Sequence, residues 1–235
     1  MRAFSRRWLV VLAWLGLLTV VGCNPATMLF FFLPIEPKEP AKFSLAQEGA
    51  KKAKDRHHQT KVLVHTTLGP GVDMEFLNVD RQLNSSVSRK LDELCKANKE
   101  KVVLIAPSKL EQFKRNHPNW ANLDPAEIGK ALEADYVISL EVAKMTIYYP
   151  NARGRLLRGQ CAISIDVIDV DAEPGDLPAY TEEYTTVYPN ENPTDIDATT
   201  NPASFRKGFL DRVSTDISFR FSAYPTDQHI RVEQP

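Results

Sequence analysis

The side chains in this sequence that could do chemistry are one early thiol and a dense group of carboxylates. Cys23 directly follows Gly22 at the end of an apolar run, and no acidic residue precedes it. The carboxylates lie in the stretch IDVIDVDAEPGD and belong to Asp166, Asp169, Asp171, Glu173 and Asp176. Carboxylate oxygens in such number could hold Ca²⁺, with Gly175 at the bend, although their spacing does not match an EF-hand loop. The alternative is a solvated strand end without a ligand.

The segment before Cys23 has the three parts of an export signal. A basic start with three arginines is followed by an apolar stretch from Trp8 to Val21 and then by the small residue Gly22. The apolar stretch spans about 14 residues, whereas a helix that crosses a bilayer needs about 20. The pattern predicts a signal peptide over residues 1–22 and export of the rest of the chain.

Val20, Val21, Gly22 and Cys23 resemble the lipobox of bacterial lipoproteins, with Val20 in place of the commoner leucine. The resemblance implies that a signal peptidase cuts between Gly22 and Cys23 and that the Cys23 thiol carries a diacylglyceryl group, with acyl chains such as palmitate. Several acyl chains on one residue give a stable membrane anchor, since a single chain binds only marginally. The protein would then belong to the bacterial cell envelope, with its bulk facing the periplasm or the exterior.

The alternative is a retained signal anchor, in which Cys23 is one more apolar residue. The stretch MLFFFL at 28–33 would extend the apolar span, but Asn24 and Pro25 interrupt it. A helix tends to end at the residue before a proline, which favours the lipoprotein. Both interpretations attach the chain to a membrane.

The exported part is predicted to form one tethered domain. Residues 23–60 contain several prolines, which favour an extended spacer. A basic stretch at 51–56 could touch anionic headgroups or be a solvated face. Residues 61–224 are expected to form a single α/β domain, and residues 225–235 a C-terminal tail.

Hydrophobic periodicity predicts the order strand, helix, strand, helix, three strands and helix. Strands are expected at 61–68, 102–107, 134–149, 156–170 and 179–189, and helices over 79–98, from Asp124 and from Asn201 to Phe221. The first strand is expected to end at the turn-forming residues Gly69, Pro70 and Gly71. A short helix with Leu110 and Phe113 facing inward is expected to end before Pro118.

Two helix starts and one strand have clear local signatures. Asp124 is followed by Pro125 and Glu127, which predicts a capping box, and Asn201 is followed by Pro202. Cys161, Ile163, Ile165 and Val167 alternate onto one face of a strand. The fold class is α/β with an α+β tendency, with two or three layers and a mixed sheet of about five strands.

The stretch IGKALEADYVISLEV at 128–142 resembles the junction between a helix and a central strand in the CsgG superfamily. That superfamily includes the amino-terminal domain of TolB and lipoproteins that activate penicillin-binding proteins. One departure is Glu133, where the superfamily commonly has glycine, so that a left-handed turn at this position would be strained. The resemblance implies a fold, while the functions of the superfamily range from pore formation to enzyme activation.

Three further groups of residues have two interpretations each. Cys95 and Cys161 could form a disulfide or be buried free thiols. His65 and His117 are isolated and fit ordinary polar or half-buried positions. The tyrosines could form an exposed partner surface or cross-strand packing. They are Tyr148, Tyr180, Tyr184 and Tyr188.

Composition narrows the class of function. With 43% hydrophobic and 25% charged residues, the chain can build a packed core. Removing the three arginines before Cys23 changes the formal net charge from −1 to −4, which gives no electrostatic reason to bind nucleic acid. The sequence lacks a phosphate-binding glycine loop, a hydrolase elbow and paired zinc histidines, so no cofactor is expected.

The sequence therefore predicts a lipid-anchored envelope protein that acts without catalysis, as a binding, assembly or regulatory module for an envelope partner. One alternative is a metal-dependent enzyme that uses the acidic residues 166–176. The other is a self-assembling homo-oligomer, although no pair of long membrane-spanning hairpins is present for a pore.

Overall fold

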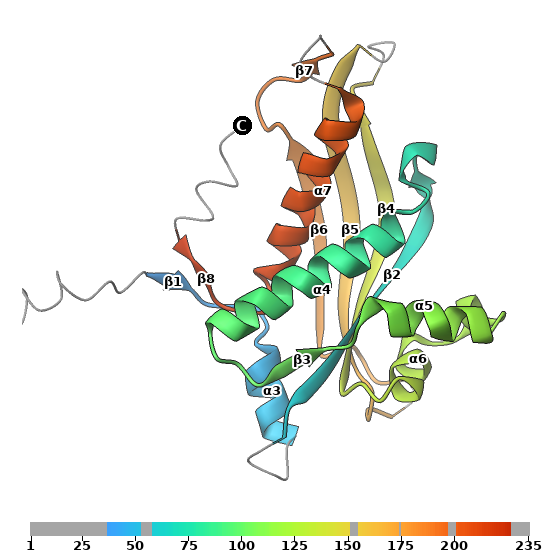
Figure 1. Ribbon diagram of the computed structural model, residues 1–235, viewed down its shortest axis with the longest axis vertical. Coiled ribbons are helices and arrows are strands. Elements are labelled where there is room, and N and C mark those ends of the chain that lie inside the picture. The colour runs from blue at the N-terminus through green and yellow to red at the C-terminus, as the bar shows by residue number, and fades with distance from the viewer. Residues whose placement is uncertain (1–36, 53–57, 151–154, 174, 197–200, 227–235) are drawn as a thin grey trace, which may run out of the picture. The chain divides into compact units, whose positions relative to one another are not determined.

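The computed structural model describes residues 37–52, 58–150, 155–173, 175–196 and 201–226 (Figure 1). All of the helices and strands described below belong to the unit Lys38–Pro235. The predicted signal peptide, the cleavage position after Gly22 and the thiol of Cys23 lie outside the described residues. Among the described residues, no helix is both long enough and apolar enough to cross a membrane.

A mixed, open sheet forms the centre of the fold, as the sequence predicts. Its main strands are β2 (Thr60–Val72), β3 (Val102–Leu104), β4 (Tyr136–Tyr148), β5 (Leu156–Asp169) and β6 (Tyr180–Tyr188), and the short β7 (Thr194–Asp195) pairs with β5. The spatial order is β3-β2-β4-β5-β6. β2 is parallel to β3 and β4, whereas β5 is antiparallel to both β4 and β6. The parallel pairs follow from helical crossovers, and the antiparallel ones from the meander at the end of the chain.

Helices cover the two faces of the sheet unequally. The long helices α4 (Val79–Ala97) and α7 (Pro202–Ser218) lie over one face in Figure 1, and the larger core cluster fills the space beneath them. The short helices α5 (Pro107–Asn116) and α6 (Pro125–Ala131) enclose a smaller cluster. Val62 and Val64 belong to the larger cluster and Leu63 to the smaller one. Because side chains alternate along a strand, the two clusters lie on opposite faces of the sheet.

The predicted helix starts are confirmed in atomic detail. Asp124 accepts a hydrogen bond from the Ala126 N–H at 2.8 Å, and its own N–H donates to Glu127 at 3.2 Å, which completes the capping box of α6. Asn201 accepts from the Ser204 N–H at 2.8 Å at the start of α7. The apolar stripe of α7 is buried, as its spacing predicts. The α5 helix likewise buries Leu110 and Phe113 and ends before Pro118.

The prediction that the first strand ends at Gly69 is wrong. β2 continues through Gly69, Pro70 and Gly71 to Val72, and its pairing with β4 shifts between Leu68 and Gly71. An extra residue in one strand forms a bulge, so that pairing resumes after the interruption. The 3-10 turns η1 (Met74–Phe76) and η2 (Trp120–Asn122) lie after β2 and before α6, respectively.

The folded part of the chain also begins before residue 61 and continues past residue 224, the boundaries expected from the sequence. The strand β1 (Lys38–Glu39) pairs with β8 (Tyr224–Pro225), and α3 (Leu45–Lys52) buries Leu45 completely in the larger core cluster. The Phe43 N–H donates to the Arg220 carbonyl at 2.9 Å. The first and last described segments are therefore held side by side.

Candidate functional site

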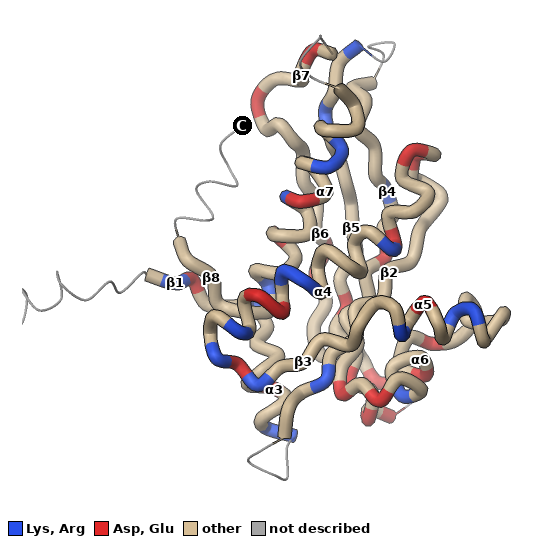
Figure 2. The backbone as a smooth tube through the Cα atoms, viewed as in Figure 1, with Lys and Arg blue, Asp and Glu red and all other residues tan. Residues whose placement is uncertain are grey.

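An open cleft of about 850 Å³ lies beside α6. One wall is α6, and the other is the end of β5 together with the segment that follows it. Five of the lining residues are acidic and one is basic. The acidic ones are Asp124, Glu127, Asp169, Glu173 and Asp176, and the basic one is Lys130. Figure 2 shows acidic residues gathered around α6 and the nearby ends of the strands.

The carboxylates singled out in the sequence are dispersed over several structural roles. Asp166 accepts a hydrogen bond from the Thr181 hydroxyl at 2.7 Å. Asp169 forms an ion pair with Lys52, which also contacts Asp171 at 3.2 Å. No three metal-ligating side chains among the described residues are grouped to hold an ion. The cation beside Asp169 is therefore the ammonium group of Lys52.

Lys52 is not predicted at this place from the sequence, because it falls within the extended, proline-containing tether expected at 23–60. It is the last residue of α3, and its ammonium group also lies 4.9 Å from the centre of the Tyr136 ring. Burial alone would lower the pKa of Lys52, but its hydrogen bonds to Asp169 and Asp171 outweigh burial and raise that pKa. The basic stretch at 51–56 thus contributes at least one residue to the fold rather than to a headgroup contact. Lys51 pairs with Glu48 on the same helix.

The four tyrosines considered as a partner surface pack inward. Tyr184 is 5% exposed, and its hydroxyl donates to Asp216 at 2.7 Å. The Tyr188 ring lies 5.5 Å from the Phe205 ring, while Tyr148 and Tyr180 pack against the larger core cluster. The structure therefore favours the packing interpretation over an exposed surface. β6 presents Tyr184 and Tyr188 to α7, which the sequence alone could not place above them.

Neither remaining thiol is arranged as a nucleophile. Cys95 and Cys161 are free and buried, so the predicted alternative of a disulfide is not what the structure shows. Burial raises the pKa of both thiols, and the pKa of Cys161 reaches about 12. A nucleophilic cysteine needs a thiolate and access to solvent. Both side chains instead serve as core residues.

The surroundings of His65 and His117 indicate structural roles for both side chains. His65 is 2% exposed, and neither of its ring nitrogens has a hydrogen-bond partner among the described residues. Burial, together with the charge of Lys114, lowers the pKa of His65 to about 4, so the ring is neutral at pH 7. The His117 ring stacks on Phe113 with the ring centres 4.1 Å apart.

A second polar cluster joins the two ends of the folded part. Glu182 on β6 accepts hydrogen bonds from Lys42 at 2.8 Å and from Arg220 at 3.0 Å, and a further one from the Tyr180 hydroxyl. Burial alone would raise the pKa of Glu182, but these three donors outweigh burial and lower that pKa to about 2. Lys42 precedes α3 and Arg220 follows α7, so one carboxylate bridges both ends.

With this geometry described, the chain can be compared with known proteins. No family model matches the sequence, and no curated protein matches it. Solved structures with some similarity include lipoprotein GNA1162 from Neisseria meningitidis, hypothetical protein CT253 from Chlamydia trachomatis and the PelC dodecamer from Paraburkholderia phytofirmans.

These three similarities are distant. Sequence identities are 11%, 16% and 12%, and the TM-scores are 0.43, 0.40 and 0.36, in the same order. The matches cover 68%, 75% and 69% of this chain and 98%, 96% and 91% of the other chains. The resemblance is one of backbone arrangement, and no activity follows from it.

Proposed function

We propose that this protein is a bacterial envelope lipoprotein, anchored through Cys23, whose exported domain acts without catalysis by binding another envelope component. The observation that supports the anchor is the sequence from Val20 to Cys23, a lipobox-like end to a short apolar segment. An apolar stretch of about 14 residues is too short to cross a bilayer as a helix. A covalently attached lipid would supply the missing membrane affinity.

The position at which the chain enters the fold is compatible with such an anchor. The first described strand begins at Lys38, and it pairs with the last described strand. Residues 24–37 lie between the thiol and this strand, and a fully extended chain of that length reaches at most about 50 Å. The start of the first described strand would therefore stay within about 50 Å of the point of attachment.

The surroundings of the titratable groups support binding rather than catalysis. Both buried thiols have a raised pKa, the buried His65 has a lowered pKa, and Asp169 is neutralised by Lys52. Neither thiol is exposed or readily ionised, as a nucleophile requires, and His65 is too buried to act as a general base. The open cleft beside α6 offers a surface for a partner instead.

The anchor is tested by mass spectrometry of the mature protein and by metabolic labelling with palmitate. We expect a diacylglyceryl-modified amino terminus at Cys23 and complete loss of label in Cys23→Ala. Cys95→Ser is the matched control and should keep the label, since it removes a different thiol. Label retained in Cys23→Ala, or a mature terminus upstream of Cys23, would overturn the proposal.

The partner and the alternatives are tested on the same protein. Crosslinking in cells should capture an envelope protein with the wild type, and the yield should fall with Cys23→Ala. The enzyme alternative predicts that a divalent ion raises the melting temperature and that Asp169→Asn combined with Asp171→Asn removes the effect. The homo-oligomer alternative predicts a single large species in gel filtration of the domain from Lys38 onward.

A further inference from the structure

The cleft beside α6 joins an apolar floor to an acidic rim. We propose that it binds a cationic segment of a partner protein, in which lysine or arginine side chains alternate with apolar ones. This inference rests on the proposed binding function and deepens it, because it names the site and the chemistry of the partner.

The floor of the cleft is apolar and firmly held. Ile168 and Val170 line it, and both pack against the smaller core cluster. A Cβ atom added to Gly129 would lie 2.8 Å from the Val170 side chain, so α6 rests directly on this floor. Packing this tight leaves little freedom to the floor, which favours a preformed site.

The rim carries an exposed apolar side chain. Leu177 is 90% exposed, the largest exposure among the large hydrophobic residues described. Its side chain gains little from the fold of this chain, and a partner that covered it would remove apolar area from water. A ligand with charge alone would leave Leu177 exposed, so the partner should also be partly apolar.

The negative charge of the rim favours a partner segment that carries positive charge. Asp169 is neutralised by Lys52, but Glu127, Glu173 and Asp176 are exposed at the cleft, and Lys130 is the one basic side chain among its described lining residues. An anionic ligand would meet repulsion there. Lysine and arginine can lay their aliphatic stems on an apolar floor while their charged ends reach carboxylates at its edge. The volume of about 850 Å³ falls within the range of ligand sites and has room for a few side chains.

The test uses the full chain in a nonionic detergent and a fluorescent seven-residue peptide that alternates leucine with arginine. We expect saturable binding in fluorescence anisotropy that weakens with salt. Glu173→Gln combined with Asp176→Asn should weaken binding by about tenfold, as expected for two exposed charge pairs. Leu177→Ser should weaken it as well, without changing the salt dependence.

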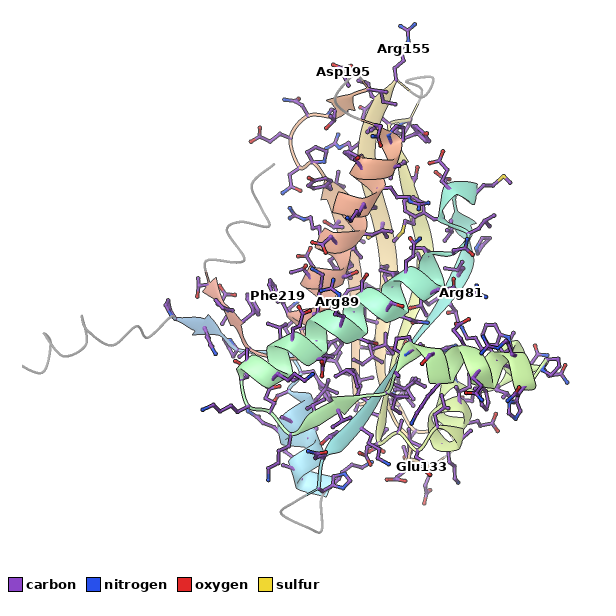
Figure 3. The ribbon with its side chains drawn as sticks, in the orientation of Figure 1. Arg81, Arg89, Glu133, Arg155, Asp195 and Phe219 are labelled. Atoms are coloured by element: carbon purple, nitrogen blue, oxygen red, sulfur yellow. The ribbon has the colours of Figure 1, made fainter. Side chains whose placement is uncertain are left out.

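A matched control neutralises acids elsewhere. Glu191→Gln combined with Asp195→Asn removes two exposed carboxylates, and Figure 3 shows Asp195 at the opposite end of the molecule from Glu133, which follows α6. This variant should bind the peptide as the wild type does. Equal weakening in both double variants would indicate a general charge effect and would overturn the proposal.

Three further outcomes decide the assignment. A peptide that alternates leucine with glutamate should not bind, and one that alternates glycine with arginine should bind more weakly. Equal binding of the glycine–arginine peptide, or full competition by spermidine, would show that the apolar floor is unused and would overturn the proposal. Peptide binding does not depend on the lipid, so an unmodified Cys23 would sink the proposed anchor and leave this inference standing.

Discussion

A Cβ atom placed on Gly71 would lie 2.4 Å from the carbonyl oxygen of Ala143 in the neighbouring strand. Gly69 is also close to this strand, with a hypothetical Cβ 3.1 Å from the Val142 carbonyl oxygen. The two glycines flank Pro70, where the pairing of β2 with β4 is shifted. They serve the close approach of two backbones at a bulge, one of the positions that glycine takes within sheets.

The first prediction is that Gly71→Ala destabilises the protein by about 1–3 kcal/mol, the usual cost of forcing an extra atom into a packed region. The obstacle is backbone on β4, which cannot rotate away as a side chain could. Urea unfolding followed by circular dichroism measures the change. Gly208→Ala is the matched control, because its added Cβ meets nothing within 4 Å and it lies in α7. That control should gain up to about 1 kcal/mol from helix propensity.

Two helices end in the same way, with a residue other than glycine in the left-handed conformation. After α6, the Ala134 N–H donates to Gly129 and the Glu133 N–H to Lys130, and φ of Glu133 is 56°. These two bonds define a Schellman motif, in which glycine usually takes the left-handed position. Lys99 repeats the arrangement after α4, also with φ of 56°. The strain expected at Glu133 from the sequence is therefore present.

We expect Glu133→Gly to raise the free energy of unfolding by about 0.5–1 kcal/mol, because glycine adopts this conformation without a Cβ clash. The ion pair lost with Lys61 is exposed, and such pairs contribute little. Glu133→Gln keeps the backbone strain and should leave stability nearly unchanged. Thermal melts of these variants and of Lys99→Gly give the comparison. A lower melting temperature for both glycine variants would contradict the strain argument.

How far the sequence could predict the structure depends on the range of the interactions. The capping box of α6, the N-cap of α7 and the alternation along β5 involve residues a few positions apart, so local patterns are sufficient. The pairing of Lys52 with Asp169 joins residues 117 positions apart and depends on where α3 packs. The run from Asp166 to Asp176 reveals one acidic wall of the cleft. The sequence does not show that α6 forms the opposite wall. The predicted strand end at Gly69 is wrong because glycine marks both turns and close backbone contacts, and the sequence alone does not distinguish them.

The buried His65 predicts loss of stability in mild acid. Its pKa is about 4 in the fold against an ordinary value of 6.5, so the unfolded chain binds more protons between these values. Stability should therefore fall as the pH drops from about 6.5 to 4, by up to about 3 kcal/mol. The charged side chains of Lys114 and Asp80 oppose each other here, and Lys114 has the larger effect.

Urea midpoints measured at several pH values between 7.5 and 4.5 test this prediction. His65→Phe should flatten the pH dependence in this window, since it removes the titrating group and keeps an aromatic ring near Trp120, whose ring centre lies 6.0 Å away. An unchanged slope in His65→Phe would assign the pH dependence to other groups.

Lys42 and Arg220, the two cationic partners of Glu182, should contribute unequally to the free energy of unfolding. The side chain of Lys42 is 60% exposed, whereas that of Arg220 is 14% exposed and lies 4.6 Å from the centre of the Tyr184 ring. Exposed ion pairs contribute up to about 1 kcal/mol, and losing one partner of a buried pair costs about 3–5 kcal/mol. Arg220→Met should therefore lower the free energy of unfolding several times more than Lys42→Met.

The pH dependence of stability tests whether the Glu182 carboxylate is the group through which Lys42 and Arg220 act. Because the pKa of Glu182 is held at about 2, below its ordinary value of 4.5, the stability that it contributes is present above pH 4.5 and is lost as the pH falls toward 2. Glu182→Gln should lower stability at pH 7 and reduce the acid dependence in that window. Arg220→Lys should recover part of the loss, since an ammonium group replaces the charge but not the planar, multidentate hydrogen bonding of the guanidinium. Equal effects of Lys42→Met and Arg220→Met would mean that burial does not control the strength of this cluster.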